Sequence, residues 1–452
     1  MEQKSWGIIV ETSFGKGYAY ICETNYIVSL LPEWYAAIPM EQKEETVRRA
    51  LEAAGEIIGE LPETFVWPLS EKEYIRKLEG EFSSVVLEIT QECTLRCEYC
   101  IYSGNYENVR VHSSCYMTKE VVKRSLDFYA AHSKNSSKAV VSFYGGEALM
   151  RFDIVKYAVS YAREIFRGKE LFFRISSNGT TLTASVLEWL NQNEDIEIVI
   201  TVNGITHDVY RKFPNGDGSL GMIMGNLQII RQQYPKLWNR VNFLANIVSL
   251  QELLELREFY MKEIGKPPLL ITGILEYGGN ERIEKILQVR DSDEAEKEIY
   301  RLYCEKQDSY LKPYFHTEVS EIRNRLIGRR EKACQITACC MPFLGSLFIS
   351  AEGSFGLCER AGIWKHCGDI YKGIDMEYVQ KIKQEVIAIF QNRCRECWCQ
   401  RLCSICFKDF QTMEDGSIEL PEVFCQRMRE SVKNALGLFC EMRERNPETV
   451  NN

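Results

Sequence analysis

Residues 92–103 read ECTLRCEYCIYS and place three cysteines, Cys93, Cys97 and Cys100, within eight residues. An apolar run, SVVLEIT at 84–90, comes directly before them. Three thiolates on one loop can belong to a structural zinc site, or they can bind three corners of a four-iron cluster whose fourth iron stays open. A zinc ion needs a fourth ligand, and the ten residues after the third cysteine contain neither His nor Cys. The spacing therefore favours the cluster over zinc.

Outward from this stretch, apolar runs alternate with amphipathic segments from residue 83 to residue 280. Strand–helix units in series predict a parallel sheet with helices outside it. Six units are too few for an eight-stranded barrel, so we expect an α/β protein built on an open, partial (β/α)6 TIM-like barrel. The expected strands are residues 84–90, 139–145, 171–177, 196–202, 241–248 and 269–276, and the clearest helices are residues 119–132, 152–166 and 185–192.

The segments on either side of this barrel have other patterns. Residues 1–80 combine short strands, a turn and a Glu-rich helix, which is typical of a small α+β domain. Residues 281–333 are charged and helical and are expected to form a bridge. Residues 334–425 carry many cysteines and little regular pattern, as expected where metal replaces a hydrophobic core. Residues 426–452 predict a closing helix.

The composition is that of a folded, water-soluble chain. It has 452 residues, of which 45% are hydrophobic and 26% charged, and this length exceeds one ordinary core. The net charge of −9 argues against non-specific nucleic-acid binding. No apolar run approaches the roughly 20 residues of a membrane span, and the N-terminus does not read as a signal peptide. We therefore expect a cytoplasmic protein with neither a nucleic-acid nor a membrane partner.

The 18 cysteines are expected to serve metal binding rather than disulfides. Disulfides are rare in the cytoplasm, and the cysteines gather at residues 93–100 and 334–425. Those that lie apart are expected to be plain buried thiols. They are Cys22, Cys115, Cys304 and Cys440.

Polar residues and glycines follow the second, third and fourth expected strands, at the strand ends where such folds build active sites. A glycine pair lets a ligand approach the backbone closely, and a carboxylate can bind a cationic group. Ser and Asn side chains can hydrogen-bond hydroxyls and carboxylates. The candidates are Gly145, Gly146, Glu147, Ser176, Ser177, Asn178, Asn203 and Arg211.

With these motifs in place, residues 83–280 resemble the radical S-adenosylmethionine (radical SAM) enzymes. Cys93-x3-Cys97-x-Tyr99-Cys100 matches the family signature CxxxCxΦC, in which Φ is aromatic. GGE at 145–147 matches the family motif that holds the amino group of S-adenosylmethionine.

The resemblance implies a partial (β/α)6 barrel with a [4Fe-4S] cluster bound by the three cysteines. Its open iron would bind the amino and carboxylate groups of S-adenosylmethionine. Cleavage of that cofactor would give a 5′-deoxyadenosyl radical, which abstracts a hydrogen atom from the substrate. The resemblance assigns Tyr99 to the adenine, Ser177 and Asn178 to the ribose and carboxylate, and Glu147 and Arg211 to cofactor binding as well.

The later cysteines resemble the SPASM extension of peptide-modifying radical enzymes. They read Cys334-x5-Cys340-x12-Gly353-x4-Cys358, then Cys394-x2-Cys397-x5-Cys403-x2-Cys406, then Cys425. By position, the family implies two auxiliary [4Fe-4S] clusters. The inner one would be held by Cys334, Cys340, Cys358 and Cys406, and the outer one by Cys394, Cys397, Cys403 and Cys425.

One departure from that pattern leaves the ligand sets open. Two residues, not three, separate Cys403 from Cys406, so Cys399 is a possible substitute for Cys406. Cys339, next to Cys340, creates a similar ambiguity, and Cys367 is expected to be a plain thiol. A pair of zinc ribbons is the alternative to two clusters.

SPASM enzymes mostly act on ribosomally made peptides or proteins. We therefore expect a maturase that forms thioether crosslinks in a Cys-rich precursor peptide and receives electrons from a small donor such as flavodoxin or ferredoxin. The first alternative is a formylglycine-forming enzyme, similar to anaerobic sulfatase maturases, or another SPASM peptide oxidase. An alternative of another class is a zinc-binding scaffold that recognises peptides.

Two further assignments follow from this resemblance. Formylglycine-type maturases carry an Asp after the cysteine that is Cys358 here, and this chain has Glu359. A carboxylate there can accept a proton from a substrate thiol or hydroxyl, although a solvated loop residue is the alternative. Residues 1–80 are expected to recognise a leader peptide by adding it as a strand to a sheet edge, with a plain packing domain as the alternative.

Overall fold

The computed structural model describes residues 5–106, 109–273, 293–336, 340–359, 367–413 and 417–446. Its contacts divide the chain into two compact units. The first unit comprises Met1–Leu69, Lys297–Met341 and Gln380–Asn452, and the second comprises Ser70–Glu296 and Pro342–Val379. Helices α12 (Asp293–Tyr300) and α14 (Met376–Ile389) contain boundaries between the units.

The second unit is built on one eight-stranded sheet in the order β10-β9-β8-β7-β6-β5-β12-β13. Neighbouring strands are parallel from β10 to β12, and β13 pairs antiparallel with β12. The strands are β5 (Ser84–Thr90), β6 (Lys138–Gly145), β7 (Glu170–Ser177), β8 (Ile196–Thr201), β9 (Val241–Ile247), β10 (Leu270–Gly273), β12 (Ser346–Ile349) and β13 (Phe355–Gly356). The predicted α/β class and the six serial parallel strands are confirmed.

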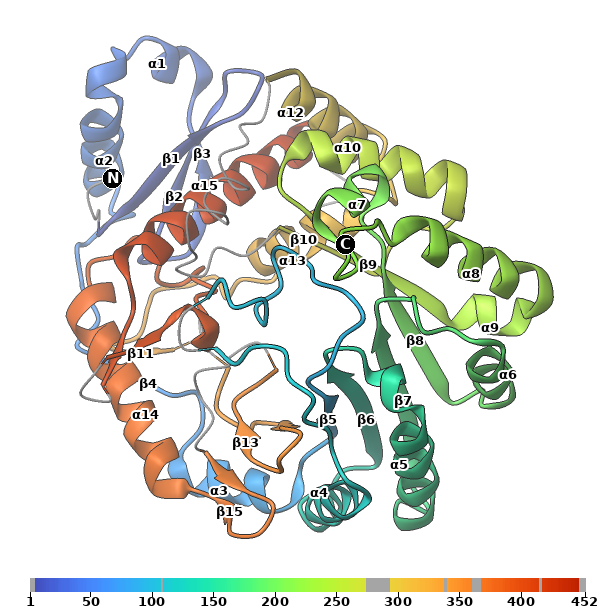
Figure 1. Ribbon diagram of the computed structural model, residues 1–452. Helices are drawn as coiled ribbons and strands as arrows, with labels where there is room; N and C mark the ends of the chain where they lie inside the picture. Colours follow the sequence, from blue (N-terminus) through green and yellow to red (C-terminus); the bar gives the residue numbers. More distant parts are fainter. Residues whose placement is uncertain are drawn as a thin grey trace. The chain divides into compact units, whose positions relative to one another are not determined.

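Helices follow the strands and lie outside the sheet, as Figure 1 shows for α4, α5 and α6 beside β5 to β7. Several begin at a Ser or Thr whose hydroxyl accepts the N–H three residues on, which satisfies one of the free donors of a helix start. The helices are α3 (Glu71–Gly80), α4 (Lys119–Ala131), α5 (Phe152–Ile165), α6 (Ala184–Gln192), α7 (His207–Tyr210), α8 (Leu220–Gln233), α9 (Pro235–Arg240) and α10 (Leu250–Phe259). A small hairpin, β14 (Gly368–Asp369) and β15 (Gly373–Ile374), completes the unit.

One part of the predicted pattern differs from the structure, and another part lies outside the described residues. The sequence grouped 342–379 with the cysteine-rich region, yet this segment supplies β12, which pairs parallel with β5. The pairing joins residues far apart in the chain, which a local pattern does not reveal. Residues 274–276 of the sixth predicted strand and residues 281–292 of the predicted bridge lie outside the described residues.

The first unit joins the two ends of the chain. An antiparallel sheet of β1 (Gly7–Glu11), β2 (Gly17–Ile21) and β3 (Tyr26–Ser29) lies beside the long helix α15 (Glu422–Arg445), as Figure 1 shows. The main-chain N–H of Ser13 donates a 2.9 Å hydrogen bond to Glu441 of α15. The other elements are α1 (Pro32–Ala36), α2 (Lys43–Ala53), β4 (Thr64–Val66), α13 (Lys312–Arg323), β11 (Ala333–Gln335), β16 (Gln411–Thr412) and β17 (Ile418–Glu419).

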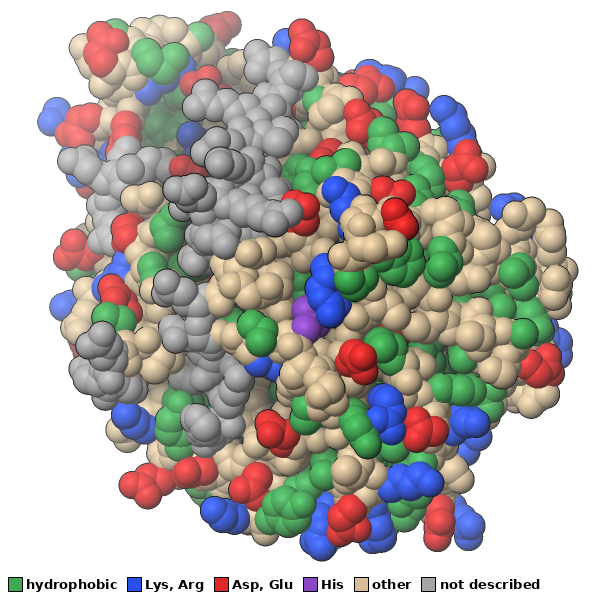
Figure 2. All heavy atoms as spheres, viewed as in Figure 1, with side chains coloured by type: hydrophobic (Ala, Val, Ile, Leu, Met, Phe, Trp, Pro, Cys, Tyr) green, Lys and Arg blue, Asp and Glu red, His purple; other side chains and the backbone are tan. Residues whose placement is uncertain are grey.

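A buried apolar cluster forms the core of the N-terminal part of this unit. Trp6, Ala19 and Ile21 from the sheet pack with side chains of α1 and α2, among them Tyr35 and Val47. Residues 1–69 thus contribute their own core as well as the contacts with α15. None of the described helices is long and apolar enough to cross a membrane. Over the barrel helices, on the right of Figure 2, Lys and Arg side chains are interspersed with Asp and Glu.

Candidate active site

The three-cysteine loop begins where β5 ends, at the carboxyl edge of the parallel sheet. Asn178, at the end of β7, places its side-chain N–H 3.6 Å from the sulfur of Cys93. The main-chain N–H of Tyr102 lies 3.4 Å from the sulfur of Cys100. Burial raises the pKa of Cys93 to about 11 and that of Cys100 to about 12, and both thiols interact electrostatically with Cys97. The structure therefore brings the three predicted ligands together.

Main-chain hydrogen bonds hold this loop in place. The N–H of Arg96 donates to the carbonyl of Lys212 (2.8 Å), and the N–H of Glu98 donates to Tyr210 (2.9 Å). The loop is thus fixed to the end of α7 and the residues just after it. This segment follows β8, which lies three strands from β5 in the sheet.

Both glycines of the GGE motif are required by the cysteine loop itself. A Cβ on Gly145 would lie 2.2 Å from the carbonyl oxygen of Thr90, and one on Gly146 would lie 2.0 Å from that of Glu92. Gly145 also has φ of +126°, a backbone conformation that other residues rarely adopt. The N–H of Gly146 donates to Thr90 and that of Glu147 to Glu92, both at 2.8 Å. These glycines therefore allow a close approach of neighbouring backbone, and the predicted ligand contact stays a prediction.

Glu147 is fully buried and joins the ends of β6 and β7. Its carboxylate accepts hydrogen bonds from the main-chain N–H of Asn178 (2.6 Å) and Leu149 (3.2 Å) and from the hydroxyls of Ser177 (3.0 Å) and Thr181 (3.1 Å). Burial raises its pKa, while these donors favour the charged form. In this structure, the carboxylate of Glu147, which was predicted to bind a cationic group, accepts hydrogen bonds from groups of the protein itself.

Tyr99 and Arg211 meet in the interior next to the cysteine loop. The hydroxyl of Tyr99 accepts hydrogen bonds from Asn203 (2.9 Å), Arg211 (3.1 Å) and Asn246 (3.4 Å). Arg211 is 6% exposed, and among the described residues its Nε has no hydrogen-bond partner. Its charge interacts with the Cys97 thiol. A buried cation with one free donor thus lies beside the predicted cluster ligands.

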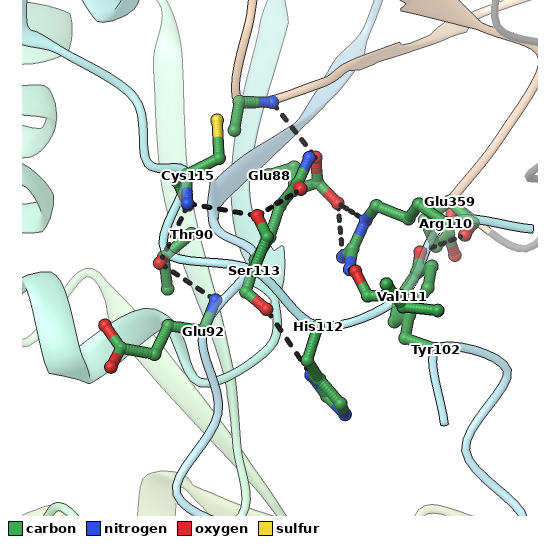
Figure 3. A network of polar contacts seen from close by, with 12 residues as sticks. Glu88, Thr90, Glu92, Tyr102, Arg110, Val111, His112, Ser113, Cys115 and Glu359 are labelled. Atoms are coloured by element: carbon green, nitrogen blue, oxygen red, sulfur yellow. Dashed lines mark hydrogen bonds and ion pairs between the residues drawn. The ribbon is translucent and has the colours of Figure 1, made fainter. Parts of the chain in front are cut away.

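A second network connects β5 to the predicted base (Figure 3). Glu88, 2% exposed, accepts a 2.6 Å hydrogen bond from Arg110 and one of 3.0 Å from the main-chain N–H of Ala351. The Arg110 guanidinium stacks 3.4 Å above the ring of Tyr102. The hydroxyl of Tyr102 donates a 3.0 Å hydrogen bond to the main-chain carbonyl of Glu359. The backbone at Glu359 is therefore attached to the residue two places after Cys100.

His112 lies next to this network (Figure 3). Its Nδ1 is 3.3 Å from the carbonyl of Gln91, and its buried Nε2 has no partner among the described residues. Burial lowers the pKa of His112, which favours the neutral imidazole. In the sequence, His112 lies twelve residues after Cys100, outside the cysteine motif.

The first unit contains a second gathering of cysteines. Cys394, Cys397, Cys403 and Cys425, the predicted outer set, all line one cavity, together with Cys399. Within the described ranges, no three His, Cys, Asp or Glu side chains are grouped closely enough to hold a single metal ion. The structure thus places the four predicted outer ligands at one cavity.

Two nitrogen donors that the sequence reading missed also line this cavity. Arg429 is 3% exposed and Gln400 is 6% exposed. Among the described residues, the Nε of Arg429 and the Nε2 of Gln400 have no hydrogen-bond partner. Arg429 lies one helical turn after Cys425 on α15, and this i, i+4 spacing is visible in the sequence.

The predicted inner set is only partly assembled within the first unit. Cys340 and Cys406 interact electrostatically there. Cys334 instead interacts with Cys22, whose sulfur lies 3.8 Å from the carbonyl oxygen of Cys397. Cys358 belongs to the second unit.

The remaining cysteines are buried thiols, one outside the described residues, and Cys115, which was predicted to be buried and is only half-buried. Cys399 accompanies the outer set, and Cys339 lies in an undescribed segment. The predicted plain thiols Cys304, Cys367 and Cys440 are buried, and burial raises the pKa of each to about 12.

Comparison with known proteins identifies the barrel. The profile of the Radical SAM superfamily matches residues 87–258, which include the cysteine loop and the ends of β6 and β7. The chain contains a radical SAM domain. The resemblance drawn from the CxxxCxΦC and GGE motifs is thereby confirmed.

Two curated relatives share parts of this radical SAM domain. An uncharacterized protein of Methanocaldococcus jannaschii is 26% identical over 176 residues, which cover 39% of this chain and 56% of that protein. The cysteine-type anaerobic sulfatase-maturating enzyme of Clostridium novyi is 27% identical over 158 residues, covering 33% of this chain and 40% of that enzyme. The matched parts are about half the length of these relatives.

A solved structure has the same fold over a longer stretch. Native anSMEcpe with bound AdoMet superposes with a TM-score of 0.57 and 17% identity, covering 82% of this chain and 99% of that one. This likeness confirms the fold of the radical SAM barrel.

Proposed function

We propose that this chain is a radical SAM oxidoreductase that modifies a peptide or protein. The observation that carries the proposal is the junction of the cysteine loop with the ends of β6 and β7. There, Gly146 packs against Glu92, and Glu147 binds the backbone of Asn178. This junction fixes three cysteines at the carboxyl edge of a parallel sheet, where such folds hold their ligands.

The residues present fit a [4Fe-4S] cluster with S-adenosylmethionine. Cys93, Cys97 and Cys100 would hold the cluster, which together with the cofactor supplies a 5′-deoxyadenosyl radical that abstracts hydrogen. The side chain of Asn178 would donate to the Cys93 sulfur. The free Nε of buried Arg211 would bind an anionic group of the cofactor, such as its carboxylate.

A peptide is the substrate class that we propose. The Clostridium novyi relative is named as a sulfatase-maturating enzyme, and anSMEcpe, with a TM-score of 0.56, has been solved with a bound Cp18Cys peptide. Both support a Cys-containing peptide as the substrate of this chain. We propose thioether crosslinking of a Cys-rich ribosomal precursor, and the sulfatase-maturase relative gives formylglycine formation equal support.

Glu359 is the candidate base for either product. Its carboxylate would accept the proton of a substrate thiol or hydroxyl. The hydrogen bond from Tyr102 to its main-chain carbonyl supports a position beside the cysteine loop.

Further cofactors and partners belong to the same proposal. We propose that the outer cysteines hold one auxiliary [4Fe-4S] cluster and that Cys334, Cys340, Cys358 and Cys406 hold another. The cavity lined by the outer set and its two free N–H donors support the first. The electron donor would be a small protein such as flavodoxin or ferredoxin.

Leader-peptide binding is proposed for the sheet β1–β3. Its order leaves β3 at an edge. The N–H of Leu30 donates inward to Gly17, so alternation turns the N–H of Ile27 outward. Ile27→Pro should therefore weaken precursor binding without altering S-adenosylmethionine cleavage in the absence of peptide. Equal precursor affinity of this variant and the wild type would remove leader binding from this edge.

The first experiment is anaerobic reconstitution followed by iron and zinc analysis and a 5′-deoxyadenosine assay under reductant. About twelve irons per chain with cleavage is the expected result. Cys97→Ala should abolish cleavage, whereas Cys440→Ala, which changes a buried thiol outside all the proposed ligand sets, should not. Zinc without cleavage would favour a peptide-binding scaffold and reject the enzyme.

Product mass distinguishes the two peptide chemistries, because forming a thioether removes two hydrogens per bond, whereas forming formylglycine from Cys removes sulfur.

A further inference from the structure

The outer cysteine cavity has an arginine built into its wall by α15. Glu422, Cys425 and Arg429 follow one another at spacings of three and four residues and share one helix face. Arg429 donates a 2.6 Å hydrogen bond from Nη2 to Glu422 and also interacts with the sulfur of Cys397. Its Nε, also buried, is left without an acceptor among the described residues.

A second arginine approaches the same cavity from the preceding segment. The Nη2 of Arg393 lies 3.8 Å from the sulfur of Cys425 and also hydrogen-bonds Glu422. Two guanidinium groups therefore share one carboxylate beside the thiols, and that carboxylate is 48% exposed. The wall of the cavity keeps a net positive charge on the side of the cysteines.

Gln400 adds a neutral donor. Its Oε1 accepts a 3.8 Å hydrogen bond from the thiol of Cys334, while its Nε2 is buried and has no partner in the described part of the chain. Buried N–H groups are nearly always paired, because leaving one unpaired costs its full desolvation. Two such groups on one cysteine-lined cavity indicate that the cavity holds an acceptor.

Sulfur is the acceptor that this arrangement fits. The sulfide and thiolate sulfurs of an iron–sulfur cluster carry negative charge and accept N–H hydrogen bonds, and a cluster with four thiolates is an anion that gains charge on reduction. A purely structural ion pair between Arg429 and Glu422 would use only the terminal Nη nitrogens of the guanidinium. The free Nε and the amide of Gln400 have no role in that pair.

We propose that Arg429 and Gln400 donate hydrogen bonds to a cluster bound by the outer cysteine set, and that Arg393, Glu422 and Arg429 set its reduction potential. The inference rests on the proposed auxiliary cluster and adds the residues that tune it. Positive charge and N–H donors stabilise the reduced cluster, which is the more negative state, and so raise its reduction potential. The carboxylate of Glu422 opposes them. The site is thereby suited to accept an electron.

The test is a redox titration followed by electron paramagnetic resonance on the reconstituted full chain. A background with Cys93, Cys97 and Cys100 changed to Ala removes the signal of the barrel cluster. In it, Arg429→Met should lower the midpoint potential of one auxiliary cluster and Glu422→Gln should raise it. Arg427→Met makes the same change on the same helix, at an exposed residue outside the cavity, and should leave the potential unchanged.

Iron content separates failure of the tuning from failure of the cluster assignment. Unchanged potentials in Arg429→Met and Glu422→Gln with full iron, or shifts of the same sign, would overturn the inference while the cluster stands. Iron unaffected by Cys394→Ala would overturn the cluster assignment itself. If Arg429→Met loses iron, Arg429→Lys keeps the charge but not the Nε donor. Arg429→Lys should then retain iron, and its midpoint potential should fall by less than that of Arg429→Met. A wild-type potential in Arg429→Lys would overturn the proposed hydrogen bond from Nε to the cluster.

Discussion

Gly146 faces the main-chain carbonyl of Glu92 so closely that a Cβ built on the glycine would lie 2.0 Å from that oxygen. Glu92 directly precedes Cys93, so this approach fixes the entry of the three-cysteine loop against the end of β6. The loop cannot retreat without breaking the 2.8 Å hydrogen bond from the N–H of Glu147 to Glu92. Any side chain at position 146 must therefore displace the loop.

Gly146→Ala should lower S-adenosylmethionine cleavage by about 100-fold, because a displacement of about 1 Å in a positioned group costs that much. The iron bound by the barrel site should fall with it. Gly225→Ala is the matched control, since a Cβ there meets nothing within 4 Å and the residue lies inside α8. Iron content and 5′-deoxyadenosine formation measure the effect. Wild-type values for Gly146→Ala would show that the loop does not depend on this contact.

Glu147→Gln tests the junction between β6 and β7. The groups around this side chain are all hydrogen-bond donors, and they belong to Asn178, Leu149, Ser177 and Thr181. A glutamine keeps one oxygen acceptor for them, but its NH2 group places two further donors against donors. Unpaired buried donors cost about 1–3 kcal/mol each, and more beside a lost charge. The free energy of unfolding should fall by at least about 1 kcal/mol in denaturant titrations. Glu120→Gln, on the exposed face of α4, should not change it.

His207 should make the stability of the barrel depend on pH. Burial, together with the charge of Arg211, lowers its pKa to about 3, while its Nδ1 accepts a hydrogen bond from the N–H of Asn203. As the pH falls, the unfolded chain therefore protonates His207 at a higher pH than the folded chain does. Neutral His207 makes its full contribution to the free energy of unfolding above about pH 6.5. This contribution is lost as the pH falls from there toward about 3.

The slope of that loss is about 1.4 kcal/mol per pH unit, so lowering the pH from 7.5 to 5 should cost about 2 kcal/mol through this residue. Denaturant titrations at several pH values measure it. His207→Gln has no titrating ring and should lack this part of the slope. Parallel curves for the variant and the wild type across that range would contradict the role of His207.

The barrel was predictable because its signals are local. Several strands are short apolar runs followed closely by candidate functional residues, as Glu147 follows β6 and Asn178 follows β7. The division into units was not predictable, because it depends on pairings between distant residues, such as Ser346 with Ser84 and Ser13 with Glu441.

The candidate sites could be predicted from the sequence only where their residues form a motif. Cysteine spacing pointed to the three-cysteine loop and to the outer cysteine cavity, and the GGE motif pointed to the end of β6 but not to the backbone contact that its glycines make. The donors around the thiols were missed, because a single Arg or Gln has no pattern of its own. Glu88 did leave a signal, since it is a charged residue within an otherwise apolar strand. Such a residue requires a buried partner, and the structure supplies Arg110.

That pair gives the last prediction. Arg110→Met should reduce the free energy of unfolding by about 3–5 kcal/mol, because Glu88 would remain charged and buried without its cation. Adding Glu88→Gln should recover most of this loss, since the second change removes the uncompensated charge. The two single variants and the double variant form a thermodynamic cycle, measured by denaturant unfolding of the full chain. Equal stability of Arg110→Met and the double variant would mean that the network around Tyr102 and Glu359 does not depend on this ion pair.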